Sequence, residues 1–184
     1  MPSTARVPLF DFDGTLVDSD AALTAPFRAL GIDPARVPLG LPLGDACEGV
    51  GISVRAYLEL YDATTVEPFD GVPELLAACR RWGLASNKAR TSGRQELERL
   101  GWAPEVALFS DDFGGQEKAL GPLLAAMHLS AEQVVFVGDT AHDRACAAAA
   151  AVPFALAGWN ARAHAAAEPG DLVLHAPADL LALL

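Results

Sequence analysis

Lysine is scarce in this chain, which has two lysines, Lys88 and Lys118, against eleven arginines. Because arginine serves here as the ordinary surface cation, each of the two lysines is a candidate for a specific role. Acidic residues outnumber both kinds of cation, and the formal net charge is -11. Nucleic acids and anionic membranes bind basic faces, so this charge predicts neither of them as a partner.

Cysteine is also sparse, and long apolar runs are missing. Cys47, Cys79 and Cys146 are odd in number and form no C-x-x-C pair, so we expect small core residues in a reducing compartment. No apolar run has the length of a membrane span, and no basic N-terminal segment precedes an apolar stretch. These absences predict a cytoplasmic protein with no membrane partner.

The chain does contain enough apolar sequence for a folded core. It has 184 residues, of which 52% are hydrophobic and 20% are charged. A chain of this size buries about 70% of its extended surface and needs no disulfide or structural metal to fold. We expect one domain, or one domain with a small insertion, as a monomer or a homodimer.

The most informative stretch lies close to the N-terminus. Val7 to Phe12 is an apolar run that predicts a buried strand, and Asp11 and Asp13 stand two residues apart at its end. Side chains two residues apart on a strand project to the same side. Gly14 then breaks the strand and lets the backbone approach a ligand. Two neighbouring buried carboxylates require a cation or a shared proton, which predicts a functional site here.

Strands and helices alternate along most of the chain. Apolar runs predict strands over residues 7–12, 84–86, 106–110, 134–139, 153–157 and 172–175. Helical spacing and breakers predict helices over 20–30, 53–63, 73–82, 91–100, 118–127, 143–151 and 178–184. This order favours a parallel sheet covered by helices on both faces, a Rossmann-like three-layer α/β/α fold.

The segment over residues 17–68 does not fit this alternation. It is too long for a crossover connection, shows no strand of its own, and is rich in Pro and Gly over 33–51. We expect that Pro- and Gly-rich stretch to be a loop with at most one short helix. The prediction is a core domain of residues 1–16 and 69–184, with residues 17–68 inserted after the first strand as a small helical cap.

Polar residues follow the predicted strands at the ends where ligands bind in such sheets. They are Asp11, Asp13, Ser86, Asn87, Asp139 and Asp143, and Lys118 could reach the same edge. Carboxylates are oxygen ligands that suit Mg²⁺, whereas hydroxyl, amide and turn N–H groups bind phosphate oxygens. A lysine supplies a point charge for the same group. Each of these residues alone could be a turn or surface residue, but together they predict a phosphate site with Mg²⁺.

Four segments resemble the signatures of the haloacid dehalogenase-like (HAD) hydrolases. Asp11-Phe12-Asp13-Gly14-Thr15-Leu16-Val17-Asp18-Ser19 resembles the first signature, and Ser86-Asn87-Lys88 resembles the second. Lys118 stands where the third signature has its lysine, and Gly138-Asp139-Thr140-Ala141-His142-Asp143 resembles the fourth, G-D-T-x-x-D. The resemblance covers the chain from Val7 onwards and is greatest to the phosphoglycolate phosphatase-like branch, whose small helical cap is inserted at the same place.

The resemblance implies hydrolysis of a phosphate monoester in two steps. Asp11 would attack phosphorus and form an aspartyl-phosphate, and Asp13 would protonate the leaving oxygen and then activate a water molecule. Phosphoglycolate or a similar small phosphorylated metabolite is the first candidate substrate.

The resemblance also implies which residues hold the metal and the phosphoryl group. The Mg²⁺ ligands would be Asp11, the backbone carbonyl of Asp13, Asp139 and Asp143. The phosphoryl group would be held by Gly14, Ser86, Asn87 and Lys118.

Two departures from the family pattern leave questions open. Ala119 follows Lys118 directly where the family commonly has proline, which comes here only at Pro122. Lys88 is therefore a possible substitute or helper for Lys118. The predicted cap is also shorter than most of its type, which leaves open how completely it covers the site.

Other activities fit the residues less well. A dehalogenase needs no metal, which would leave Asp13 and the pair Asp139 and Asp143 unexplained. The family's phosphonate hydrolases use a cap lysine and its sugar-phosphate mutases a cap histidine, but residues 17–83 contain neither. A mutase stays as one alternative. Another is a non-catalytic receiver-like phosphoacceptor domain, which would lack the second aspartate and the insertion.

Overall fold

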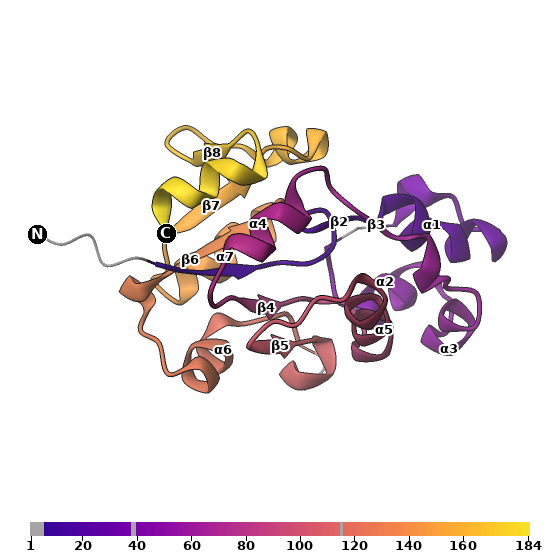
Figure 1. Cartoon of the computed structure of the whole chain (residues 1–184). Coiled ribbons are helices and arrows are strands. Elements are labelled where there is room, and N and C mark those ends of the chain that lie inside the picture. The colour runs from indigo at the N-terminus through magenta and orange to yellow at the C-terminus, as the bar shows by residue number, and fades with distance from the viewer. Residues whose placement is uncertain (1–5, 38–39, 115) are drawn as a thin grey trace, which may run out of the picture.

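A parallel six-stranded sheet forms the centre of the molecule, as the computed structural model shows for residues 6–37, 40–114 and 116–184 (Figure 1). Its order is β5-β4-β1-β6-β7-β8, and every neighbouring pair is parallel. The strands are β1 (Val7–Phe10), β4 (Gly83–Ala85), β5 (Val106–Leu108), β6 (Val134–Gly138), β7 (Phe154–Ala157) and β8 (Leu172–Leu174). The predicted α/β Rossmann-like fold class is confirmed.

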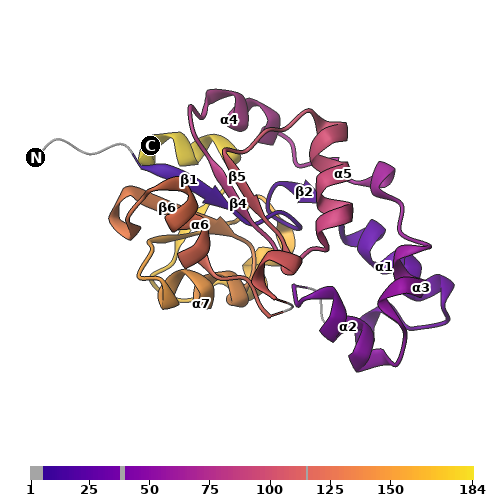
Figure 2. The same cartoon turned by 90° about the horizontal axis from the view of Figure 1, so that it is seen from below.

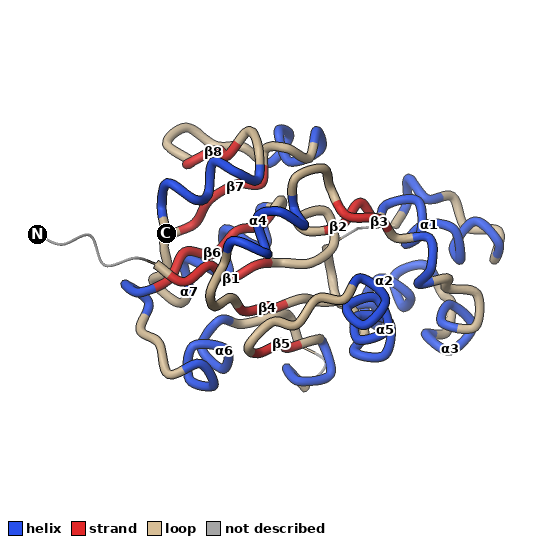
Figure 3. The backbone as a smooth tube through the Cα atoms, in the orientation of Figure 1, coloured by secondary structure: helices blue, strands red, loops and turns tan. Residues whose placement is uncertain are grey.

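Helices lie on both sides of this sheet and beyond one end of it (Figure 3). The α-helices are α1 (Asp20–Ala29), α2 (Leu43–Val50), α3 (Val54–Leu58), α4 (Val72–Ala78), α5 (Arg90–Leu100), α6 (Leu120–Met127) and α7 (Ala141–Ala149). Short 3₁₀ helices cover Pro34–Arg36, Ala63–Thr65, Ser110–Phe113, Ala131–Gln133, Ala161–Ala166 and Pro177–Leu183. None of the helices in these described ranges has the length and apolarity needed to cross a membrane.

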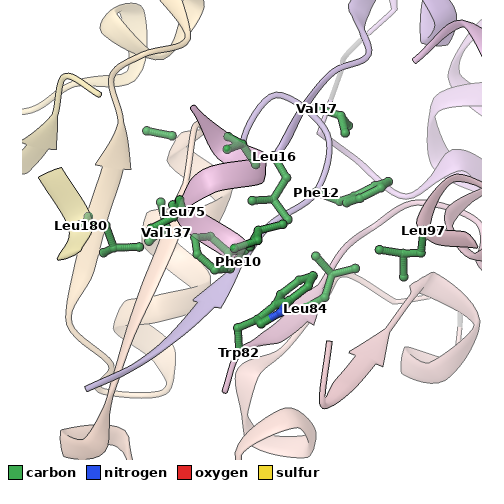
Figure 4. Packing of buried hydrophobic residues seen from close by; sticks show 14 of the residues in the cluster. Phe10, Phe12, Leu16, Val17, Leu75, Trp82, Leu84, Leu97, Val137 and Leu180 are labelled. Atoms are coloured by element: carbon green, nitrogen blue, oxygen red, sulfur yellow. The ribbon is translucent and has the colours of Figure 1, made fainter. Parts of the chain in front are cut away.

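The central strands bury both of their faces. Along β6, Val135 and Val137 pack in one cluster with side chains of α4, α5 and the C-terminal 3₁₀ helix, together with Phe10 of β1 (Figure 4). Val134 and Phe136 pack in a second cluster with α6 and α7. Because successive strand residues point to opposite faces, one continuous apolar run supplies both layers, which explains why β6 is the clearest strand in the sequence.

The helices α1, α2 and α3 stand apart from the sheet, beyond the end to which β1 runs (Figures 1 and 2). They enclose a small hydrophobic cluster of their own, formed by Phe27, Val37, Ala46, Cys47 and Tyr57. This arrangement is the one expected of a helical cap. We propose residues 17–68 as its bounds.

The prediction that this segment has no strand of its own was wrong. The strand β2 (Val17–Asp18) pairs antiparallel with β3 (Glu67–Pro68) where the chain leaves and re-enters the core. A strand of two residues carries no detectable alternation, so sequence patterns cannot reveal it. The prediction of at most one short helix over 33–51 was also too low, because a 3₁₀ turn at Pro34–Arg36 precedes α2.

Several predicted helices differ in their limits. The one predicted over 53–63 ends at Leu58, and the one over 73–82 runs from Val72 to Ala78. In the second case the chain turns after Ala78 and brings Trp82 edge-on to Phe10, with ring centroids 6.0 Å apart. The helix predicted from Lys118 begins at Leu120, and the C-terminal helix is 3₁₀ rather than α.

Candidate active site

The first strand delivers two aspartates to one cavity. The N–H of Asp11 donates to the Val137 carbonyl at 2.9 Å and extends the β1–β6 pairing by one residue. The buried Phe12 then starts a tight turn, in which the Leu16 N–H donates to the Phe12 carbonyl at 2.9 Å. Asp11 and Asp13 both line a cavity of about 440 Å³ between the sheet edge and the cap. The two aspartates therefore face the same cavity, which agrees with the sequence prediction that they project to one side.

Gly14 is needed here for close approach. Its φ is +78°, and a Cβ at this position would lie 2.3 Å from Oδ2 of Asp139. The same carboxylate oxygen accepts a hydrogen bond from Nδ2 of Asn160 at 3.2 Å, and that amide also donates to the Gly14 carbonyl at 2.8 Å. Gly14 thus lies against Asp139, and its predicted contact with phosphate stays a prediction.

Three carboxylates gather around Lys118. Asp11, Asp139 and Asp143 each place one oxygen within 4.8 Å of the others, and all three side chains are buried. Nζ of Lys118 lies 2.5 Å from Oδ1 of Asp11 and 2.6 Å from Oδ1 of Asp143. The structure therefore brings together residues that lie as far as 132 positions apart, from 11 to 143, as the strand-end argument predicts.

Asp143 reaches this cluster from the start of α7. Its Oδ2 accepts hydrogen bonds from the Thr140 N–H at 2.9 Å and from the Thr140 hydroxyl at 2.5 Å, which caps the helix. A Cβ on Gly138 would lie 2.4 Å from Cγ of Asp143, so glycine is required there as well. The second oxygen, Oδ1, faces Lys118 and has no hydrogen-bond partner of good geometry.

The charges of the cluster are out of balance. Burial raises the pKa of Asp11, and Asp143 and Asp139 raise it further, although the Lys118 ammonium lowers it. Burial, and then the charge of Asp143, raise the pKa of Asp139 to about 7. For Lys118, burial alone would lower the pKa, but the charges of Asp11 and Asp143 raise it overall. One ammonium faces three carboxylates, so the site favours an additional cation.

A divalent metal ion fits these residues. The donors are buried carboxylate oxygens close enough to share one ion, and Oδ1 of Asp143 is unsatisfied by hydrogen bonds. Carboxylates are hard oxygen ligands, which Mg²⁺ prefers over the nitrogen and sulfur ligands typical of zinc sites. Asp11, Asp139 and Asp143 are therefore the side chains that could hold the metal.

Ser86 and Asn87 lie at the end of β4 and line the same cavity. The Ser86 hydroxyl accepts from the Lys88 N–H at 3.2 Å. The Asn87 amide joins two other segments, because its Nδ2 donates to the Gly40 carbonyl and its Oδ1 accepts from the Lys118 N–H, both at 2.7 Å. The second contact fixes the backbone of Lys118 just before α6, although Lys118 is not followed by the proline that the family commonly has there.

Lys88 belongs to a different group from Lys118. Its Nζ donates to Oδ1 of Asp13 at 2.9 Å and to the Tyr61 hydroxyl at 2.9 Å, and lies 3.2 Å from Oε1 of Glu96. The Tyr61 hydroxyl donates to the same Glu96 oxygen at 2.5 Å. The side chains of Lys88 and Glu96 are 3% and 0% exposed, so this is a buried ionic network with one end on Asp13.

Sequence reasoning missed three members of the site. Asn160 follows β7, so the strand-end argument could have found it. Glu96 stands four residues after Ser92, on the buried face of α5. A carboxylate on the buried face of a helix needs a partner, so its position could have marked it as a member of a polar site. Tyr61 is brought to Lys88 only by the packing of the cap, and no local pattern marks it.

Comparisons with known proteins agree with this geometry. The family model described as "Haloacid dehalogenase-like hydrolase" matches residues 48–157. A "Phosphoglycolate phosphatase" of Xylella fastidiosa is 30% identical over 86% of this chain and 82% of its own. A "Tyrosine-protein kinase PtkA" of Mycobacterium tuberculosis is 30% identical over 84% of this chain but 62% of its own.

A solved structure supports the same fold. The crystal structure described as a "putative phosphoglycolate phosphatase" from Lactobacillus plantarum superposes with a TM-score of 0.79 at 22% identity, covering 98% of this chain and 100% of the other. The chain therefore belongs to the haloacid dehalogenase-like hydrolases, as a phosphatase of the phosphoglycolate phosphatase-like branch.

Proposed function

We propose that this chain hydrolyses small phosphate monoesters with Mg²⁺, through a phosphoryl group held covalently on Asp11. One observation carries the proposal: Asp11 and Asp13 line one cavity, and Asp11 stands in contact with Lys118 and close to Asp139 and Asp143. In this proposal the set supplies a nucleophile, a separate acid and base, a phosphoryl clamp and metal ligands.

In the first step an oxygen of Asp11 attacks phosphorus, and the bond from phosphorus to the ester oxygen breaks. Asp13, in its protonated form, gives its proton to that oxygen, which leaves as an alcohol. In the second step Asp13 takes a proton from water, whose oxygen attacks phosphorus. The bond to Asp11 breaks, inorganic phosphate leaves, and both side chains return to their starting states.

Lys118 and the end of β4 supply the charge and the donors for the group being transferred. The Lys118 ammonium already lies 2.5 Å from the attacking carboxylate, so it can contact both that oxygen and a phosphoryl oxygen. Ser86 and Asn87 line the cavity from the end of the neighbouring strand, and the Ser86 hydroxyl and the Asn87 N–H complete the phosphate site in this proposal.

Asp11, Asp139 and Asp143 would hold Mg²⁺, together with the backbone carbonyl of Asp13. When bound, the ion neutralises negative charge on the phosphoryl oxygens and orients them for in-line attack. The raised pKa values of Asp11 and Asp139 support this assignment, because burial and the neighbouring carboxylates both disfavour negative charge that a bound cation would offset.

Lys88 has a separate role in this proposal, as a positioning residue for Asp13. Its contacts fix one Asp13 oxygen at 2.9 Å, while Glu96 and Tyr61 hold the ammonium from behind. Lys118 is therefore the phosphoryl clamp, and Lys88 keeps the acid and base pointed into the cavity.

Release of phosphate from p-nitrophenyl phosphate with and without Mg²⁺ tests the proposal. We expect many turnovers per chain with the metal and none in excess EDTA. A receiver-like domain would instead accept one phosphoryl group per chain, and that result would replace the proposal. Because one relative bears the name of a tyrosine kinase, ATP with a tyrosine peptide provides a parallel assay, in which we expect no phosphotyrosine.

A further inference from the structure

The cavity above Asp11 has two unlike walls. The sheet side is polar and carries Asp11, Asp13, Ser86, Asn87, Lys118 and Asp139. The cap side is mostly apolar, formed by Leu23, Phe27, Val37, Leu41, Leu43 and Ala46 together with the two tyrosines of the chain. If the phosphoryl group binds at the polar wall, the organic part of the ester must face the apolar one.

Both tyrosines that line the cavity have their hydroxyl groups bonded within the protein. The Tyr57 hydroxyl donates to the Leu23 carbonyl at 3.0 Å, and the Tyr61 hydroxyl donates to Glu96 at 2.5 Å. Tyr57 also packs on Phe27, with ring centroids 4.8 Å apart, and on Tyr61 at 5.8 Å. Because the hydroxyl groups are already bonded within the protein, the tyrosines add aromatic carbon to this wall and no free polar group.

Each cation in the described lining of the cavity has a carboxylate partner. Lys88 contacts Asp13, Lys118 contacts Asp11, and the third, Arg162, lies 2.6 Å from Oδ1 of Asp20. Asp20 itself lines the cavity and adds negative charge beside the apolar wall. A second anionic group on the substrate would meet this charge, and no unpaired cation among the described lining residues would offset it, in a chain whose net charge is -11.

The arginines of the cap lie elsewhere. Arg28, Arg36 and Arg55 are exposed, and the described lining of the cavity includes none of them. Arg55 pairs with Glu59 at 2.8 Å while its side chain is 89% exposed. These residues, which are the obvious carboxylate readers in the sequence of the cap, are therefore not placed to read a substrate carboxylate.

We infer that the preferred substrate is a phosphate monoester whose organic part is uncharged and largely apolar, and bulkier than glycolate. This inference rests on the proposed function and narrows its substrate class. The volume of about 440 Å³ lies within the usual range of ligand pockets and exceeds what a phosphoryl group with a two-carbon acid would fill. Carboxylated esters such as phosphoglycolate become poor substrates.

A homologous series of esters tests this inference directly. We would measure kcat/KM with Mg²⁺ for ethyl, butyl and hexyl phosphate, which release primary alcohols of similar reactivity, and for 2-phosphoglycolate. Because a fully buried methylene contributes about a fourfold change in binding, the four methylenes added from ethyl to hexyl phosphate should raise kcat/KM by up to about 200-fold. The kcat/KM for hexyl phosphate should exceed that for 2-phosphoglycolate.

Two results would overturn the inference in different ways. A flat alkyl series with 2-phosphoglycolate as the best ester would refute the substrate class and leave the phosphatase intact. Failure to hydrolyse any ester, p-nitrophenyl phosphate included, would refute the proposed function and the inference with it.

Variants of the apolar wall provide a matched test. Leu43→Arg places a cation on the wall and should lower kcat/KM for hexyl phosphate at least tenfold while raising it for 2-phosphoglycolate. Leu60→Arg is the control, because Leu60 is 46% exposed and lies outside the cavity lining. Leu23→Gln serves as a milder second variant should Leu43→Arg fold poorly. Equal ester ratios in these wall variants, the control and the wild type would count against the inference.

Discussion

At the scale of the residue, the proposed chemistry depends on three side chains at strand ends and on a lysine from a loop. Asp11 follows β1, Ser86 follows β4, Asp139 follows β6, and Lys118 reaches the same place from the loop before α6. Their proximity follows from the parallel sheet, whose strands end along one edge. The two lysines lie in separate buried networks, which supports the separate roles proposed for them.

The separate roles of the two lysines predict different kinetic defects. Lys118→Ala removes the positive charge that would contact the phosphoryl group during transfer, so kcat/KM should fall about 10²- to 10³-fold for every ester. Lys88→Ala disturbs the proton transfer by Asp13, so kcat/KM should fall about tenfold or more for an alkyl phosphate and far less for p-nitrophenyl phosphate. The reason is that p-nitrophenolate leaves without a proton.

Arg94→Ala is the control for these two variants, because Arg94 is an exposed cation on α5. Steady-state kinetics with both esters are the measurement. If the loss in Lys88→Ala were the same for the two esters, Lys88 would not act through Asp13.

At the scale of the element, polar contacts join the cap to the core on the rim of the site. Asn87 at the end of β4 donates to the Gly40 carbonyl, and Tyr61 after α3 donates to Glu96 on α5. The β2–β3 ribbon supplies a third connection where the chain crosses between the two parts. Apolar packing adds to these contacts, because Ala22 and Val66 of the cap belong to the same buried cluster as the core.

The buried Glu96 makes stability depend on pH in a definite direction. Burial raises the pKa of Glu96 from 4.5 to about 7, although Lys88 lowers it, and Asp13 and Tyr61 are the other titratable groups nearby. Between these two pH values the folded chain keeps a proton that the unfolded chain releases. The free energy of unfolding should therefore fall as pH rises through this window, by up to about 3 kcal/mol from this group.

Glu96→Gln should remove this contribution. Urea unfolding at pH 5 and pH 8 in EDTA is the measurement, and Glu98→Gln on the exposed side of α5 is the control. We expect a smaller loss of stability from pH 5 to pH 8 in Glu96→Gln than in the wild type and the control. Identical losses in all three proteins would show that Glu96 titrates normally.

At the scale of the whole molecule, much of the fold follows from the sequence. β6 is recognisable because four apolar residues precede Gly138, and Asp139 then marks the end of the strand. The two-residue strands β2 and β3 are beyond such patterns, and so is the order of the sheet, since strand pairing depends on contacts between distant segments.

Some residues of the site can also be predicted from the sequence, and others cannot. Asp11, Asp139 and Ser86 are predictable because each is a polar residue that directly ends an apolar run. The contacts of Glu96 and Tyr61 with Lys88 are not predictable, because they depend on how α5 and the cap pack together. Asn87 was expected in the site, but its two side-chain bonds to Gly40 and Lys118 required the structure.

Metal binding should stabilise the whole chain. An ion that binds only the folded state adds about 2.7 kcal/mol to the free energy of unfolding at a hundred times its Kd. Mg²⁺ should therefore raise the Tm of the wild type, and this shift should be much smaller in Asp139→Asn, which loses a charged ligand. Differential scanning calorimetry in EDTA and in excess Mg²⁺ is the measurement. Equal shifts in both proteins would remove Asp139 from the metal site.

The covalent phosphoryl group on Asp11 is the central claim, and mass spectrometry after rapid acid quench tests it most directly. The wild type is mixed with Mg²⁺ and p-nitrophenyl phosphate, quenched during turnover and digested. We predict one added phosphoryl group on the peptide that contains Asp11 in the wild type. Asp11→Asn should show neither this group nor turnover, while its circular dichroism spectrum stays the same as that of the wild type. Asp11→Asn turning over at the wild-type rate, or a phosphoryl group on another peptide, would contradict the account.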